Sequence, residues 1–339
     1  MVKIGIVIPY FGKFPNYFDL FLKSCEKNPT IDWLIFSDIN TPYNYPPNVR
    51  RIHITFSELK EMFQSKFDFP ISLENPYKLC DYKVMTGYLF SEYLKEYDYW
   101  GYSDVDMLFG DIRKFLPDKK VSQYDKVGHL GHLTLYRNTE EINKLFMKPI
   151  YGNEIYRTVL SSDSHFSFTE WYGTNINDIF VNQKKSIWFC NDFFDVEAYE
   201  ENFHRITLHV EYDNLAARKW VMEKKATFAS WEDGKVYQWI RKEGRWIKKE
   251  YMYVHFQKRK MEVCINPVDT KQFLCVPNQF IPYSDRIEQK YIWRSIKMGI
   301  INKKYWKQWF KVTKYKIVEM TGPIRHFFRN NRAKIRKIK

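Results

Sequence analysis

The chain has 339 residues and 45% of them are hydrophobic, which is enough to bury a sizeable core and excludes a chain that is disordered throughout. Its five cysteines are odd in number and include no closely spaced pair, so a disulfide framework and a cysteine zinc site are excluded and a reducing cytosol is favoured. The net charge of +14 is uneven, because residues 290–339 hold 16 Lys or Arg and one acid, which leaves the rest of the chain near neutral.

Residues 1–110 alternate between short apolar runs and segments with the spacing of amphipathic helices. Strands are expected at 3–9, 33–36 and 51–55, and helices at 17–25 and 56–65. A longer helix is expected at 81–96, followed by strands at 97–103 and 128–136. This alternation predicts βαβ units, and therefore an α/β fold with a mostly parallel central sheet flanked by helices.

Beyond residue 140 the pattern is weaker. Residues 226–246 are expected to form an antiparallel hairpin with turns at Asp233-Gly234 and Glu243-Gly244. Residues 290–339 interleave nine aromatic residues with cations and are expected to form basic amphipathic helices. No uninterrupted apolar run approaches the length of a membrane-spanning helix, so neither a signal peptide nor a membrane span is expected. We divide the chain into a domain at 1–260, a connecting segment at 261–289 and a basic helical tail at 290–339.

The most informative stretch is WGYSDVDMLFGDI at 100–112. Asp104 and Asp106 flank one apolar residue at the carboxyl end of an expected strand, which is the edge where open α/β sheets bind ligands. Paired carboxylates provide the hard oxygen ligands that Mg²⁺ and Mn²⁺ prefer, and leave positions open for phosphate oxygens. A D-x-D pair is also common in ordinary loops, so the position after an apolar strand is what favours a metal site.

This stretch resembles the DxD motif of glycosyltransferases with the GT-A fold. The wider segment 76–116, the opening IGIVIPYFG and the block IDWLIFSDINTPYNYPPNVR are similar to bacterial glycosyltransferases of capsular and surface-polysaccharide biosynthesis. The resemblance covers about residues 1–260. It implies a GT-A, Rossmann-like fold, a Mn²⁺ or Mg²⁺ ion on Asp104 and Asp106, a UDP-sugar as donor, and a hexose transferred to a growing glycan or a lipid-linked acceptor.

The resemblance also implies roles for residues around the motif. In similar enzymes the first two strands hold the nucleoside, which maps onto Pro9, Tyr10, Phe11 and Asp38. A basic residue in the helix before the metal strand contacts the donor phosphates or a metal-binding carboxylate, and Lys83 matches it. A cation near a helix N-terminus is not favoured by the helix dipole, which supports a specific role over a solvated surface lysine.

A late histidine is the third metal ligand in several GT-A families, followed by a lysine that reaches the diphosphate. The run YVHFQK matches this pattern and assigns the two roles to His255 and Lys258. Imidazole is an acceptable ligand for Mn²⁺, although a lone histidine is more often structural. Four other histidines lack such support and are expected to be structural: His129, His132, His204 and His209.

Glu170 lies between aromatic residues in the run FSFTEWYG. An acid in this position can bind sugar hydroxyls while Trp171 stacks on a sugar face, or it can deprotonate the acceptor as a general base. Similar families have a pair of acids here, whereas this chain has Thr169 and Glu170. Acceptor binding and base catalysis therefore both remain open for Glu170, and a retaining enzyme needs no such base.

The basic tail has three interpretations. Anionic membrane surfaces attract basic residues and accommodate aromatic rings, which favours a cytoplasmic protein bound peripherally to the inner face of the plasma membrane. A nucleic-acid site is disfavoured because no recognition motif is present and the body is near neutral. The tail is alternatively a helical pair packed on the domain. For the whole protein, the alternatives to a glycosyltransferase are a carbohydrate-binding protein and a nucleotidyltransferase, although the latter's Gly-rich phosphate loop is missing.

Overall fold

The computed structural model describes residues 1–284 except 151, 171–174, 199, 201 and 212–213. Its strands are β1 (Ile4–Pro9), β2 (Ile31–Ser37), β3 (Val49–His53), β4 (Tyr99–Ser103), β5 (Met107–Phe109), β6 (Lys126–Val127), β7 (Leu133–Arg137), β8 (Ile187–Trp188), β9 (Phe194–Val196), β10 (Arg205–Glu211), β11 (Asn214–Met222), β12 (Phe228–Glu232), β13 (Lys235–Lys242), β14 (Arg245–Tyr251), β15 (Tyr253–His255), β16 (Glu262–Val263), β17 (Gln272–Val276) and β18 (Gln279–Pro282).

The helices lie mostly between the early strands. They are α1 (Phe18–Glu26), α2 (Phe56–Gln64), α3 (Leu79–Tyr82), α4 (Thr86–Leu89), α5 (Ile112–Phe115), α6 (Asp118–Val121), α7 (Glu140–Asn143), α8 (Ile155–Leu160) and α9 (Ile176–Asn182), with 3₁₀ turns at Pro76–Lys78, Lys83–Met85, Ser91–Tyr93 and Leu145–Met147. α2 begins at a capping box, in which Thr55 and Glu58 bond reciprocally to each other's backbone N–H.

The central sheet has seven strands in the order β3-β2-β1-β4-β7-β6-β8. β3, β2, β1 and β4 are mutually parallel, β7 is antiparallel to both of its neighbours, and β6 is parallel to β8. The α/β class and the mostly parallel central sheet expected from the sequence are therefore confirmed. Carboxyl ends of parallel strands meet at one edge, so the residues after β1, β2 and β4 share that edge.

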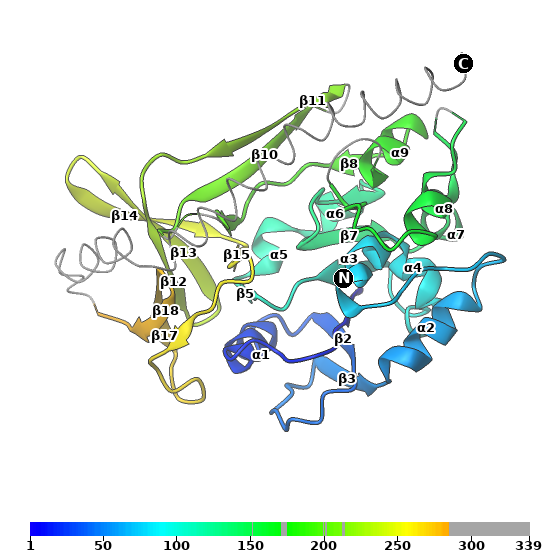
Figure 1. Cartoon of the computed structure of the whole chain (residues 1–339). Helices are drawn as coiled ribbons and strands as arrows, with labels where there is room; N and C mark the ends of the chain where they lie inside the picture. Colours follow the sequence, from blue (N-terminus) through cyan, green and yellow to red (C-terminus); the bar gives the residue numbers. More distant parts are fainter. Residues whose placement is uncertain (151, 171–174, 199, 201, 212–213, 285–339) are drawn as a thin grey trace, which may run out of the picture.

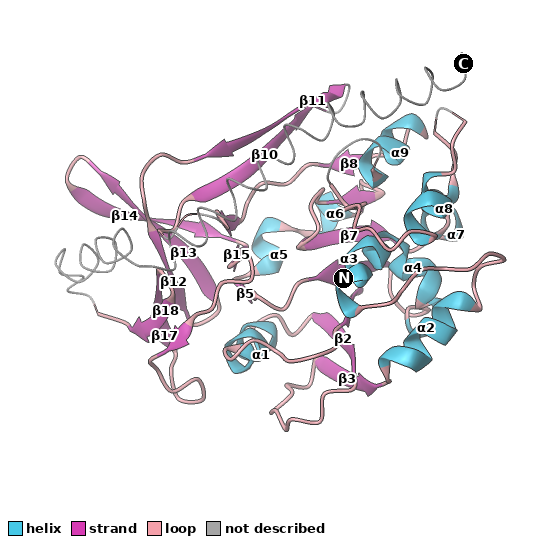
Figure 2. Ribbon diagram, viewed as in Figure 1, coloured by secondary structure: helices cyan, strands magenta, loops and turns pink. Residues whose placement is uncertain are grey.

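Both faces of this sheet are buried, as expected for parallel strands that read as continuous apolar runs. One face packs on residues of α2, α4, α8 and α9, and the other on residues of α1, α5 and α6. Alternate residues of β1 serve the two faces, with Ile4, Ile6 and Ile8 on the second and Val7 on the first. Figure 2 shows α2, α4, α7 and α8 gathered on one side of the sheet.

Two smaller sheets complete the described part of the chain, in the orders β11-β10-β9-β15-β5 and β14-β13-β12-β17-β18-β16. Figure 1 shows the six-stranded sheet beside the central sheet, with the long β10–β11 hairpin along the upper edge. The turns at Asp233-Gly234 and Glu243-Gly244 are confirmed, and all four residues have positive φ, as type I′ turns require. They join three strands rather than the two of a simple hairpin.

The prediction of a long helix at 81–96 is wrong. The segment is divided among α3, α4 and two 3₁₀ turns, and the backbone leaves helical geometry at Met85 and Phe90. Gly87 is pressed against the central sheet: a Cβ there would lie 2.2 Å from Trp100 Nε1 and 2.4 Å from Asn143 Oδ1. This close approach of α4 to β4 is a tertiary contact that the helical spacing of the sequence does not reveal.

The strand expected at 128–136 is also only partly right. β7 begins at Leu133, and residues 128–132 form a loop that opens at Gly128 with a φ of +88°. Two other expectations concern the end of the chain. Residues 261–284 of the expected connecting segment contribute β16, β17 and β18 to the six-stranded sheet, and the expected tail at 290–339 lies outside the described residues. Within the described residues, no helix is long and apolar enough to cross a membrane.

Candidate functional site

Polar residues gather where the parallel strands β1, β2 and β4 end. Pro9 and Tyr10 close β1, Asp38 follows β2 directly, and Asp104 follows β4. Tyr10 is half-buried, and its pKa is raised first by this burial and then by the carboxylates of Asp106 and Asp104. The aromatic ring expected at a nucleoside site therefore lies within electrostatic reach of the carboxylate pair.

The carboxylate pair occupies the short connection between β4 and β5. β5 leaves the central sheet and pairs with β15, so that Met107 faces His255 across an antiparallel ladder. His255 Nε2 lies 3.4 Å from Asp106 Oδ1 and 3.8 Å from Asp104 Oδ2. Asp106 and His255 are buried, whereas the side chain of Asp104 is 33% exposed and gives the cluster an open side.

Asp104, Asp106 and His255 suit a divalent metal ion. Their ligand atoms all lie within 4.8 Å of one another. Neighbouring ligands of a six-coordinate Mg²⁺ or Mn²⁺ are about 3 Å apart, so a small contraction of the observed distances would bring all three into coordination. Two carboxylates and one imidazole are a donor set suited to Mn²⁺. The residues present therefore fit the metal, and the partly exposed side leaves room for further oxygen ligands.

Asp106 is held by the chain that follows His255. Its Oδ2 accepts a hydrogen bond from the backbone N–H of Lys258, and its carbonyl accepts one from Phe256 at 2.9 Å. Gln257 and Lys258 both have positive φ, which turns the backbone so that the N–H points at the carboxylate. Burial alone would raise the pKa of Asp106, but His255 and this hydrogen bond lower it, so the carboxylate is ionised.

Lys83 fixes the other carboxylate. Its Nζ donates to Asp104 Oδ1 at 2.6 Å and to the carbonyl oxygen of Gly131 at 2.8 Å. Burial would lower the pKa of Lys83, but the adjacent Asp104 outweighs it and the pKa is raised. The basic residue expected beside a metal-binding carboxylate is therefore in contact with it, as a permanent positive charge.

Glu170 lies next to this contact. A Cβ added at Gly131 would come within 2.8 Å of Glu170 Oε2, so the Glu170 carboxyl group lies directly against the loop at 128–132. Glu170 Oε2 is inaccessible to solvent and has no hydrogen-bond partner among the described residues. Burial raises the pKa of Glu170 to about 7. Trp171, expected to stack on a sugar, lies outside the described residues.

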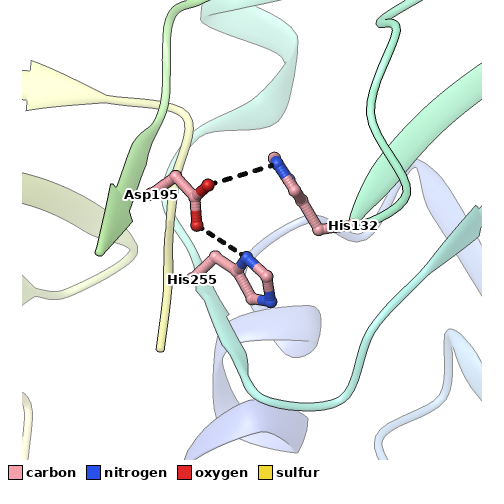
Figure 3. A group of neighbouring side chains, drawn as sticks. All are labelled: His132, Asp195 and His255. Atoms are coloured by element: carbon pink, nitrogen blue, oxygen red, sulfur yellow. Dashed lines mark hydrogen bonds and ion pairs between the residues drawn. The ribbon is translucent and has the colours of Figure 1, made fainter. Parts of the chain in front are cut away.

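Two residues that the sequence did not single out complete the cluster. Asp195 on β9 is fully buried, and its Oδ1 lies 2.8 Å from His255 Nδ1. Its Oδ2 lies 3.8 Å from Nε2 of His132, a histidine expected from the sequence to be structural. Figure 3 shows the carboxylate between the two imidazoles. The available signal for Asp195 was a single acid inside the apolar run FFDV, a pattern of a buried charge with a specific partner.

The remaining expected site residues lie nearby with other contacts. Phe11 is buried and its ring meets Phe56 with 5.3 Å between centroids, so it fills the core. Lys258 Nζ lies 4.1 Å from the centre of the exposed Tyr77 ring. Roles in donor binding for these residues, and for Pro9 and Asp38, stay predictions.

This protein is therefore of the α/β class. Carboxylate and imidazole groups converge at the carboxyl edge of its parallel strands. Within that class, the chain belongs to the family of unknown function DUF6625, whose model matches residues 6–284. No curated protein matches the chain.

Two solved structures similar to the chain are of one enzyme. A galactosyltransferase, LgtC, in complex with donor and acceptor sugar analogs is 14% identical with a TM-score of 0.34, over 57% of this chain and 75% of that chain. An active-site mutant of LgtC is 13% identical with a TM-score of 0.34, over 57% of this chain and 74% of that chain. At this level of identity and overlap, the similarity transfers neither a site nor a function.

Proposed function

We propose that this protein is a metal-dependent glycosyltransferase of the GT-A type, which moves a sugar from a nucleotide-diphosphate sugar to an acceptor hydroxyl. The observation that carries the proposal is the convergence of Asp104, Asp106 and His255 at the carboxyl edge of β4, with Lys83 bonded to Asp104. Three segments distant in the chain meet there to form one cation site. The sequence resemblance around the D-x-D pair supports the same assignment.

The donor binds at the open side of this cluster. When bound, the divalent ion supplies positive charge that stabilises the diphosphate as it leaves. Asp104, Asp106 and His255 hold that ion, and Lys83 keeps Asp104 oriented and adds a fixed positive charge. Tyr10 and Asp38, at the ends of β1 and β2, provide the place for the nucleoside. The donor is a UDP-hexose on the strength of the resemblance.

Glu170 acts on the hydroxyl group of the acceptor. The acceptor hydroxyl oxygen forms a bond to the anomeric carbon while the bond from that carbon to the diphosphate oxygen breaks, and the nucleoside diphosphate leaves with the electron pair. In an inverting reaction Glu170 takes the hydroxyl proton. A carboxyl whose pKa is raised to about 7 is suited to this, since it can hold and release a proton near neutral pH. The acceptor is a growing surface glycan or a lipid-linked oligosaccharide at the cytoplasmic face of the membrane.

The proposal is tested first by calorimetric titration of UDP into the full chain with Mn²⁺ and then with EDTA. We expect binding only with the metal, and its loss in Asp104→Ala. Asp98→Ala is the matched control, because Asp98 lies at the opposite end of β4, where it accepts a hydrogen bond from the Lys3 backbone. Equal affinity with Mn²⁺ and EDTA would contradict the metal site. Failure of UDP and other nucleotides to bind would point to a glycan-binding protein.

A second measurement addresses the chemistry. Asp106→Asn keeps the shape of the side chain but removes its charge, and its amide nitrogen would repel the bound cation. Sugar transfer should fall by at least about 10²-fold while the circular dichroism spectrum is unchanged. Unchanged turnover in this variant would refute the site.

A further inference from the structure

Asp195 is the buried centre of a chain of polar contacts behind the cation site. Its Oδ1 accepts hydrogen bonds from His255 Nδ1 and Gln257 Nε2, each at 2.8 Å. Its Oδ2 faces His132 Nε2 at 3.8 Å, and neither of these two buried atoms has a hydrogen-bond partner among the described residues. A buried carboxylate is costly unless it is paired, so its retention here indicates a task that an apolar residue cannot perform.

Tyr253 determines which nitrogen of His132 carries the proton. The Tyr253 hydroxyl lies 2.8 Å from His132 Nδ1, in a buried setting. If the hydroxyl donates to Nδ1, then Nε2 is protonated and its N–H faces the Asp195 carboxylate. The opposite tautomer would direct the Nε2 lone pair at a negative charge. The contacts therefore assign Tyr253 as the donor to His132 Nδ1, and direct the N–H groups of both imidazoles at the Asp195 carboxylate.

The backbone places these groups with little freedom. β15 lies between β9 and β5, and His255 is in register with Asp195 on one side and Met107 on the other. His132 ends the loop before β7, and its backbone carbonyl accepts from the Asp104 N–H at 3.0 Å. The imidazole rings of His132 and His255 lie 4.7 Å apart between centroids, and Figure 3 shows each ring in contact with one oxygen of the carboxylate.

We infer that Asp195 is a positioning residue that holds the His255 imidazole with Nε2 directed at the divalent ion, and that His132, oriented by Tyr253, faces the second oxygen of that carboxylate. The inference rests on the proposed function in taking Asp104, Asp106 and His255 as the metal ligands. An imidazole can present either nitrogen by rotating its ring. The hydrogen bond from Nδ1 to Asp195 fixes one orientation and makes the ligating nitrogen more basic.

The test measures Mn²⁺ binding to the full chain without nucleotide, by calorimetry. Asp195→Asn keeps the size of the side chain but removes its charge, and the dissociation constant for Mn²⁺ should rise by about 10- to 100-fold. His132→Gln should give a smaller rise. Asp125→Asn is the matched control, because Asp125 also accepts hydrogen bonds, from Ser186, but lies away from the cluster; its Mn²⁺ affinity should equal that of the wild type.

A second measurement needs no variant. In the ¹⁵N spectrum of the wild type with Mg²⁺, His255 should have a protonated Nδ1 and a ligating Nε2, and the opposite tautomer would overturn the inference. Equal Mn²⁺ affinity in folded Asp195→Asn would also overturn it, while leaving the proposed function intact. Two Mn²⁺ ions per wild-type chain and one in Asp195→Asn would show that Asp195 is itself a ligand, against the inference. Absence of Mn²⁺ binding by the wild type would refute the metal site and the inference together.

Discussion

The Glu170 carboxylate lies beside a fixed cation yet is withdrawn from water. The charge of Lys83 acts to lower the pKa of Glu170, but burial still raises it from 4.5 to about 7. Desolvation therefore outweighs the attraction of the lysine. A carboxyl in this state changes its charge near neutral pH, where a base that deprotonates a hydroxyl is most effective.

Activity should follow this ionisation. If Glu170 is the base, the rate of sugar transfer rises with pH through about 7, as the carboxylate forms. Glu170→Gln should lose this rise and lower turnover by about 10²- to 10⁴-fold. The measurement is a pH–rate profile at saturating donor. A Gln variant that keeps both the rate and the rise near pH 7 would show that the titrating group is elsewhere.

Stability provides a separate readout of the same group. Because the folded-state pKa is raised, the folded protein binds more protons than the unfolded chain between pH 4.5 and about 7. The free energy of unfolding should therefore fall as pH rises through this window. Urea unfolding at pH 5 and pH 8 should show a smaller difference in Glu170→Gln than in the wild type. An identical difference in both proteins would mean that the Glu170 carboxyl is solvated.

At this scale the sequence predicted the acids near the strand ends, together with Lys83 and His255, but not the roles of Asp195 and His132. Asp104 and Asp106 are adjacent to an apolar strand, so a local pattern is sufficient to identify them. Asp195 and His132 lie far apart in the chain and come together only when β9, β15 and the loop before β7 assemble. Their pairing depends on the register of strands from separate segments, which no local pattern contains.

Asp104 and Asp106 follow directly after β4, so the packing of this strand determines where they lie. Trp100 on this strand stacks on Tyr136, with ring centroids 4.2 Å apart, and donates to Asn143 Oδ1 at 2.6 Å. Gly87 in α4 is the residue against which the indole rests. The helix expected at 81–96 breaks at Met85 and Phe90, on either side of Gly87, and the periodicity of the sequence contains no information about this packing.

Gly87→Ala should therefore destabilise the fold. The added methyl would overlap Trp100 Nε1 and Asn143 Oδ1, and overpacking of this kind costs about 1–3 kcal/mol. The measurement is the free energy of unfolding in urea. Glu92→Ala is the control, since Glu92 is exposed in the following turn, and its change should stay within about 0.5 kcal/mol. A stable Gly87→Ala protein would show that α4 can move away from the sheet without loss.

At the scale of the whole molecule, the site exists because separate sheets meet. β5 follows β4 of the central sheet directly in the chain but belongs to the five-stranded sheet, and Trp231 of the six-stranded sheet donates to the Phe109 carbonyl of β5 at 2.9 Å. The parallel part of the central sheet could be predicted, because β1, β2 and β3 follow one another in the chain and are joined by local connections. The pairing of β12 with β17 joins segments that are separated in the chain by β13, β14, β15 and β16, so the sequence predicted the turns around β13 but not the sheet.

The positive charge of the whole chain is concentrated in residues 290–339 of the sequence. Residues 290–339 carry a net charge of +15 and should bind anionic vesicles of phosphatidylglycerol and phosphatidylcholine. Each basic residue near the surface should contribute about 1 kcal/mol to the free energy of binding. The variant that tests this replaces four lysines by Gln, at Lys303, Lys304, Lys307 and Lys311. Its binding to the vesicles, measured by flotation, should be weaker by up to about 10³-fold.

The matched control removes the same charge from exposed positions of the body, at Lys119, Lys224, Lys225 and Lys242. This variant should float like the wild type at low salt, because only charges close to the membrane contribute. High salt should release both proteins, since the Debye length shortens to about 3 Å at 1 M. Equal loss of flotation in the two variants would assign the attraction to net charge alone, and unchanged flotation of the tail variant would exclude the tail as the membrane contact.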